Sequence, residues 1–464
     1  MSLSKEIYME QEHRSENPLG VLPVPVLLKK FAVPSIIAML TSALYNIVDQ
    51  FFIGNSVGEL GNAATNIAFP LSTACISIAL LFGIGGASAF NLAKGRQDEK
   101  EAVHCMGNAI TGMVVLGSIL LMITQLFLEP MIRFFGAPDS IMEYSKAYIR
   151  ITSLGFPVLI LTAGGGHLIR ADGSPKMSMI CNVTGAIINT ILDALFVFGF
   201  GWGMAGAAWA TVIGQYISVI LVIRYLLHCK TVDLKPEHLK LAVCYVKKDM
   251  VLGAAACSNQ LAMMVVQLVM NKSLTYYGGL SSYGQEIPLA CAGIITKVNQ
   301  VFFSVIIGIS QGLQPIVSYN YGAENFHRVK KGYLLAAKTG LVISVIAFLI
   351  FQIFPRQIIA IFGNGSEEYI RFAVSYFRIF LFFTFLNFIQ PITSNSFTAI
   401  GKPGLGMFLS LTRQILFLLP LIVVFPLFIG IDGILFAGPV ADGLAGVVAI
   451  VLMCRELKRP EYQM

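Results

Sequence analysis

Twelve long apolar stretches follow one another along this sequence, and each is long enough to cross a lipid bilayer as a helix. Inside the hydrocarbon core only helices or closed barrels satisfy every backbone hydrogen bond. Because 56% of the 464 residues are hydrophobic and 12% are charged, against about 25% charged in soluble domains, the sequence predicts an all-α integral membrane protein and excludes a soluble enzyme. The stretches are 26–53, 63–93, 102–127, 144–169, 177–200, 205–227, 249–273, 287–319, 329–353, 373–400, 405–429 and 433–453.

The loops between these stretches alternate in charge. Lys and Arg concentrate in one set of loops, whereas 54–62, 199–204 and 430–433 contain neither. Basic loops remain on the cytoplasmic side of a membrane. The alternation fits twelve crossings with both termini cytoplasmic, so we interpret the net charge of +7 as a topology signal and expect no nucleic-acid partner. The basic set is 94–100, 170–176, 228–248, 327–331, 401–403 and 455–459.

The sequence also repeats itself at an offset of about 227 residues. Residues 134–151 resemble 361–379, and the loop residues Gly173 and Pro175 match Gly401 and Pro403. An offset of six crossings gives both halves the same orientation, which is one known plan of membrane transporters. We therefore expect two six-helix lobes related by pseudo-two-fold symmetry.

These features divide the chain into five predicted segments. They are a cytoplasmic N-terminal tail (1–25), a first lobe (26–227), a cytoplasmic linker (228–248), a second lobe (249–453) and a cytoplasmic C-terminal tail (454–464). The polar N-terminal tail does not resemble a cleavable signal. The eight cysteines form no CxxC pair and are interpreted as core residues. Without an HExxH motif or a phosphate-binding loop, we expect no cofactor and no metal apart from a coupling Na⁺.

Two acidic residues, Asp49 and Asp193, lie inside apolar stretches, where a carboxylate costs about 2.5–3.5 kcal/mol on insertion scales. A rise of 1.5 Å per residue places them, together with Asn189 and Thr211, roughly 8–15 Å below the same surface. Carboxylate, amide and hydroxyl oxygens suit Na⁺, and two adjacent carboxylates favour retention of a proton. The sequence thus predicts an H⁺ or Na⁺ site, with a merely structural carboxyl pair as the alternative.

Other polar residues inside the stretches are interpreted as parts of a transport path. Pro34 lacks a backbone N–H and permits a bend, so we predict a conformational hinge there, with a static kink as the alternative. In the second half, Gln260, Asn299, Gln300 and Arg413 are predicted to line a substrate cleft. For each of them, structural anchoring is the alternative interpretation.

These motifs resemble the multidrug and toxic compound extrusion (MATE) family over roughly residues 26–455. The resemblance rests on YNIVDQFFIG around Asp49, FGA at 135–137, GSPK at 173–176, the spacing of Asn189 and Asp193, and GAAWAT at 206–211. LLKKFAVPSIIAML, FGAPDSI and LTRQILFLLP (411–420) are most similar to the MepA-like bacterial subgroup.

The resemblance implies two six-helix lobes in a V shape and export of cationic amphipathic drugs against entry of H⁺ or Na⁺. It also implies that Asp49, Asn189, Asp193 and Thr211 form the cation site and that Pro34 forms the bend. The seventh, eighth and tenth stretches have no acidic residue near their middle. This departs from the NorM-type pattern, so the resemblance supports no cation site in the second lobe.

We therefore predict a secondary active multidrug exporter and not an enzyme. It is expected to act as a monomer in the bacterial cytoplasmic membrane, with the lipid bilayer and small cationic drugs as partners. The alternative is a lipid-linked oligosaccharide flippase of the same superfamily, whose cationic cavity would depend on Lys297 and Arg413. A membrane-embedded transferase is a third interpretation, but the chain lacks the acidic clusters that it needs. The choice between H⁺ and Na⁺ stays open.

Overall fold

The computed structural model describes residues 17–56, 59–135, 139–284, 286–361 and 366–463, and every regular element within these ranges is helical. Twelve helical segments in these ranges are long and apolar enough to cross a membrane, which confirms the predicted all-α membrane fold. Residues 1–16 of the N-terminal tail and residues 136–137 of the FGA motif lie outside the described ranges. The elements are α2 (Pro18–Val21), α3 (Val24–Ser56), α4 (Glu59–Gly95), α5 (Glu99–Leu126), α6 (Leu128–Phe134), α7 (Asp139–Thr152), η1 (Ser153–Gly155), α8 (Phe156–Ala171), α9 (Pro175–Asp193), η2 (Ala194–Gly199), α10 (Gly203–Leu226), η3 (Pro236–Leu239), α11 (Val243–Gly279), α12 (Glu286–Gly322), α13 (Phe326–Ile353), α14 (Pro355–Ile361), α15 (Glu367–Phe380), η4 (Phe382–Leu386), α16 (Ile389–Ala399), α17 (Pro403–Leu411), η5 (Thr412–Leu418), α18 (Leu419–Ile429), α19 (Ile431–Leu457) and η6 (Pro460–Tyr462).

The two halves of the chain have the same succession of helices and breaks. A short helix precedes a longer one in each half, as α6 and α7 in the first and α14 and α15 in the second. Gly173 has φ +84° and Gly401 has φ +75°, a conformation that costs little only for glycine. Each is followed by a proline at the first helical position, where its missing N–H is harmless. Local sequence therefore builds the same turn twice.

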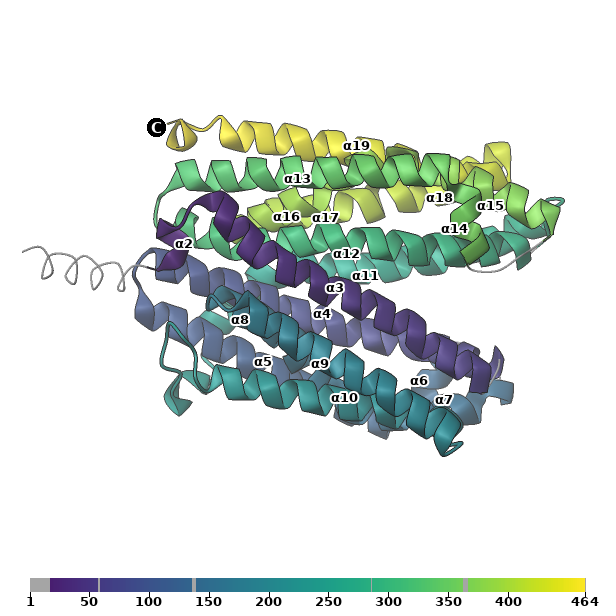
Figure 1. Cartoon of the computed structure of the whole chain (residues 1–464), viewed down its shortest axis with the longest axis horizontal. Helices are drawn as coiled ribbons and strands as arrows, with labels where there is room; N and C mark the ends of the chain where they lie inside the picture. The colour runs from purple at the N-terminus through teal and green to yellow at the C-terminus, as the bar shows by residue number, and fades with distance from the viewer. Residues whose placement is uncertain (1–16, 57–58, 136–138, 285, 362–365, 464) are drawn as a thin grey trace, which may run out of the picture.

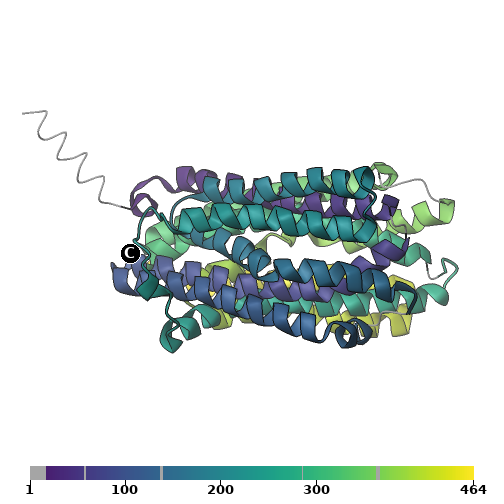
Figure 2. The ribbon, with the colours of Figure 1, turned by 90° about the horizontal axis from the view of Figure 1, so that it is seen from below.

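Each half has its own hydrophobic core. Figure 1 shows α4 to α10 in the lower part of the molecule and α12 to α19 in the upper part, with α3 crossing obliquely between them. The start of the first crossing packs on the second half, because Leu27 and Phe31 belong to the core of that half. From the side (Figure 2), the long helices run nearly along one common direction.

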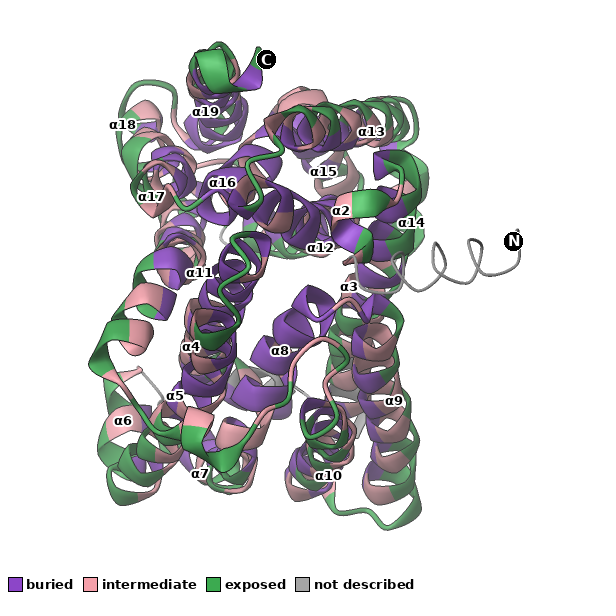
Figure 3. Cartoon of the chain, turned by 90° about the vertical axis from the view of Figure 1, so that its left-hand side faces the viewer, coloured by how far each residue is buried: buried purple, intermediate pink, exposed green. Residues whose placement is uncertain are grey.

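The halves meet where α11 packs along α4 and α12 packs along α3. Figure 3 looks onto the end of the bundle where α3 begins and α19 ends. We call this the terminal end. Gly253 of α11 lies directly against the Leu81 carbonyl, and Gly312 of α12 lies against the Ala32 backbone. Both glycines lie in the half of their helix nearer the terminal end. The absence of a Cβ thus lets the two lobes close tightly there.

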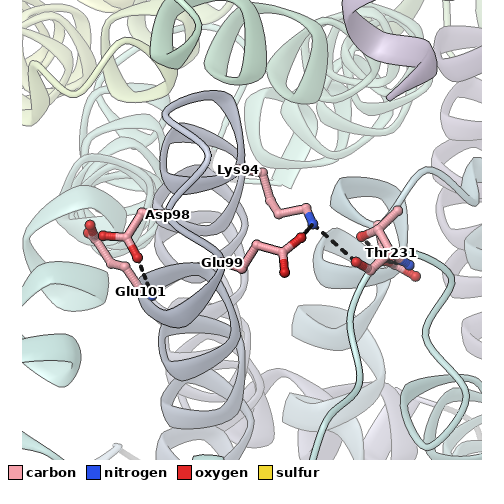
Figure 4. Close-up of polar contacts among 6 residues, drawn as sticks. Lys94, Asp98, Glu99, Glu101 and Thr231 are labelled. Atoms are coloured by element: carbon pink, nitrogen blue, oxygen red, sulfur yellow. Dashed lines mark hydrogen bonds and ion pairs between the residues drawn. The ribbon is translucent and has the colours of Figure 1, made fainter. Parts of the chain in front are cut away.

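The chain connecting the halves is fastened to the first half. Asp172 accepts hydrogen bonds from the backbone nitrogens of Lys230 and Thr231 at 2.6 and 3.0 Å. Lys94 Nζ donates to the Thr231 carbonyl at 3.1 Å (Figure 4). The last six residues of the predicted linker 228–248 are helical, since α11 begins at Val243. Val246 packs against the first core, which explains this earlier start.

Both described chain ends are docked on the second half and are not free tails. Arg328 Nη2 donates to the carbonyls of Leu22 and Leu19 at 2.6 and 3.1 Å, and Leu19 is buried in the second core. At the other end α19 continues to Leu457, and Tyr462 is buried in the same core. The predicted cytoplasmic tails 1–25 and 454–464 therefore include residues that pack on the second half, Leu19 and Tyr462 among them.

Candidate functional site

Two carboxyl groups face each other where α3 packs against α9. Asp49 projects from α3, and Asp193 is the last residue of α9. The Asp193 side chain is 0% exposed, and the two groups lie within interacting distance. In the described part of the chain, Asp49 Oδ1 and both Asp193 oxygens have no hydrogen-bond donor. Two ionised carboxylates offer only acceptors, so a proton or a cation is needed to bridge them.

Two further oxygens adjoin this acid pair. Asn189 lies one turn before Asp193 on α9, and its Nδ2 donates a 3.2 Å hydrogen bond to Thr211 Oγ1 of α10. The amide nitrogen is thereby oriented towards α10, while the buried Asn189 Oδ1 has no donor among the described residues. The structure thus places all four residues of the predicted cation site on three neighbouring helices. The atoms of these residues that could bind a cation are all oxygens, which suits H⁺ or a hard cation such as Na⁺.

Two tyrosines that sequence reasoning missed also adjoin the acid pair. Tyr45 lies one turn before Asp49 on α3, and Tyr148 comes from α7. Both lie close enough to interact electrostatically with Asp49 and Asp193. Tyr45 also reaches the hydroxyl of Thr211. The four-residue spacing from Asp49 was a signal for Tyr45. Tyr148 had none, because its approach depends on the packing of α7.

An apolar layer closes the site towards the end of the bundle opposite the terminal end. Ile53 and Val197 lie one turn beyond Asp49 and Asp193, and Ala207 lies one turn before Thr211. All three belong to one buried cluster. Val197 is part of η2, a π-helical segment that begins directly after Asp193. Such segments are rare and concentrate at functional sites. The acid pair is therefore a screened, internal site.

The second half holds a buried charged cluster around Arg413. Arg413, predicted as a cleft cation, forms an ion pair with Asp442 of α19 at 2.6 Å from Nε to Oδ1. Asn387 Nδ2 donates to the other carboxylate oxygen at 2.9 Å. The Arg413 guanidinium carbon lies 5.8 Å from the centre of the Phe303 ring. Arg413 is therefore neutralised. Asp442 was overlooked, although an acid inside an apolar stretch is the signal that identified Asp49.

The remaining predicted cleft residues lie on the two helices that meet the first half. Gln260 is partly buried on α11, while on α12 Asn299 is partly buried and Gln300 is exposed. Asn299 Oδ1 has no donor in the described ranges. Lys297 is partly buried on α12. In the part of the chain that the structure describes, no three His, Cys, Asp or Glu side chains group together as a metal site.

Comparison with known proteins gives a consistent result. The family model MatE matches residues 34–195 and 255–424. The chain is 25% identical to the multidrug export protein MepA of Staphylococcus saprophyticus over 430 residues, which covers 91% of this chain and 92% of that protein.

Solved structures share the fold. One described as a MATE protein in the straight conformation has a TM-score of 0.88 and 20% identity, and covers 95% of this chain and 97% of its own. Another, described as the outward-facing conformation of a multidrug resistance MATE family transporter of the MOP superfamily, has a TM-score of 0.84 and 21% identity, with coverage of 93% and 95%. With more than half of its length matched by the family model, the chain belongs to the MatE family of multidrug and toxic compound extrusion proteins, and its relatives there include MepA.

Proposed function

We propose that this protein exports cationic amphipathic drugs in exchange for H⁺ or Na⁺ by alternating access of its two lobes. The observation that carries the proposal is the pair Asp49 and Asp193, whose buried oxygens lack donors. One bound cation removes the repulsion between the carboxylates. A drug cation that gains from their negative charge therefore competes with the coupling ion, and linkage makes each ligand weaken binding of the other.

Pro34 is well placed to connect this site to the lobe interface. It is buried in α3, which continues through it as a single helix. On either side of it, Ala32 lies against Gly312 and Ile36 lies against Gly308 of α12. The missing N–H of Pro34 leaves a helix carbonyl unpaired and makes bending less costly. A bend there changes the direction of the segment that carries Asp49.

The lobes are closed at the terminal end, and we propose that this end faces the cytoplasm. The turns and helix ends there contain the basic residues Lys94, Lys176, Lys330 and Lys402, as the positive-inside rule requires. In this orientation the lobes are closed on the cytoplasmic side.

The flippase alternative is not supported by the charges of the second half. A pyrophosphate headgroup needs an excess of positive charge, and Asp442 neutralises Arg413. Lys297 remains as the sole cation of the two that the alternative invoked, opposite two carboxylates in the first half. A preference for anionic over cationic dyes in competition assays would support the flippase function instead.

The decisive experiment imposes a pH gradient and a Na⁺ gradient separately across proteoliposomes and follows transport of tetramethylrhodamine methyl ester, a lipophilic cation. One of the two gradients should drive transport. Asp49→Asn and Asp193→Asn should each abolish that coupling. Asp432→Asn is the matched control, since Asp432 is exposed at the start of α19. Normal coupled transport by both site variants would show that the coupling site is elsewhere.

A further inference from the structure

The second half contains a charged cluster that the first half replaces with glycines. Gly173 and Gly401 are 228 residues apart, as are Pro175 and Pro403. At the same offset, Arg413 corresponds to Gly185 and Asp442 to Gly214. Gly185 and Gly214 pack against each other, because a Cβ on Gly214 would lie 2.9 Å from the Gly185 carbonyl oxygen. The fold therefore brings these two helices together without any ion pair at this position.

An ion pair inside a membrane protein contributes little to stability, because desolvation offsets the attraction between its charges. Asp442 is 2% exposed and uses both of its oxygens, one for Arg413 Nε and one for Asn387. Each carboxylate oxygen thus accepts one hydrogen bond, which fixes the orientation of the Asp442 side chain. Its role is to hold the Arg413 guanidinium in one orientation.

The edge of that guanidinium that carries Nη1 and Nη2 makes no hydrogen bond within the described ranges. Arg413 keeps 13% of its side chain exposed, and among the described residues its Nη1 and Nη2 have no acceptor. A guanidinium offers five N–H donors in a planar fork that matches two oxygens. The ring of Phe303 beneath it and Gln300, one turn away on α12, provide an aromatic surface and a further polar group. Arg413 also lies in η5, a π-helical segment, as functional residues often do.

We propose that Arg413, held by Asp442 and Asn387 and backed by Phe303, is a subsite for the carboxylate of a zwitterionic aromatic substrate. The ion pair has no net charge, so an anion alone would add an uncompensated charge in a medium of low dielectric constant. A zwitterion brings its own positive charge, which the acidic first half accommodates. This inference rests on the proposed export function and extends its substrates from monocations to zwitterions.

The test compares tetramethylrhodamine, which carries a free carboxylate, with its methyl ester, which does not. Both dyes share one aromatic cation. Arg413→Gln should raise the KM for tetramethylrhodamine by at least about tenfold, the loss of one charge-assisted hydrogen bond, and leave the KM for the ester unchanged. Arg413→Lys keeps the charge without the fork and should give an intermediate KM. Because Arg413→Gln leaves Asp442 unpaired, the double variant Arg413→Gln/Asp442→Asn serves where the single one does not fold.

Equal loss of both dyes would show a structural ion pair and overturn the inference, as would an unchanged KM for tetramethylrhodamine. An effect of Arg413→Gln that appears only when phosphatidylglycerol is present would assign the subsite to a lipid phosphate instead, and would also overturn it. Transport of the ester reports separately on the proposed function. If the unaltered protein does not export the ester, the function itself fails; if it does, a negative result concerns Arg413 alone.

Discussion

Gln314 of α12 donates a 2.8 Å hydrogen bond from Nε2 to Ser88 Oγ of α4 and so ties the two halves together inside their buried interface. The same nitrogen donates to the Ile84 carbonyl at 3.1 Å. Both side chains are buried, so opening the terminal end exchanges these bonds for bonds to water. The pair therefore favours the closed terminal end by about 1 kcal/mol.

Gln314→Leu should shift the equilibrium towards opening at the terminal end, because it removes the donor and leaves the Ser88 hydroxyl unpaired. Cys105 is a natural reporter, being 0% exposed in a cluster with Leu252 of the other half. In a variant whose sole cysteine is Cys105, Gln314→Leu should accelerate alkylation by about three- to tenfold. Gln352→Leu is the control, since this exposed amide binds a carbonyl of its own half. Equal alkylation rates would show that the bond does not hold the interface.

Asp249 and Asp442 provide opposite predictions for the same chemical change. Asp249 is 0% exposed on α11, and neither of its oxygens has a donor in the described part of the chain. Asp249→Asn removes a buried carboxylate without a partner and should raise the melting temperature, because an amide is less costly to desolvate. Asp442→Asn leaves the Arg413 charge unpaired and should lower it, by the equivalent of about 3 kcal/mol. A shift of the same sign in both variants would contradict this account.

Much of the fold was predictable because the membrane restricts the solutions. Apolar length and loop charge identified all twelve crossings, and the inner turns at Gly173 and Gly401 follow from local rules. The helical rise per residue also placed Asp49 and Asp193 at the same depth below one membrane surface. What depends on packing was not predictable, including the approach of Tyr148 to the acid pair and the docking of Leu19 on the second half. Asp442 is a different case, since an acid inside an apolar stretch was visible in the sequence and was not considered.

Cysteine labelling tests both an electrostatic effect and the orientation of the chain. Burial and the charge of Asp172 raise the pKa of Cys229 to about 12, against about 8.5 for a free thiol. Since only the thiolate reacts, Cys229 should resist a membrane-impermeant maleimide at pH 7 and should still react far more slowly than an exposed cysteine at pH 9. Cys454 is exposed near the terminal end. Single-cysteine Cys454 should react in everted vesicles and not in intact cells; the reverse pattern would place the termini outside.

The last prediction concerns Pro34, which separates two contacts of α3 with α12. Replacement by Ala supplies the missing N–H and favours an unbent helix. Pro34→Ala should therefore slow transport of tetramethylrhodamine methyl ester several-fold while leaving its equilibrium binding within about twofold, because the acid pair lies several turns away. Pro403→Ala is the matched control, as this proline occupies the start of α17, where an N–H has no helical partner. Unchanged transport in Pro34→Ala would reduce the proline to a static feature, and alternating access would then depend on movement of whole lobes across the Gly312 contact.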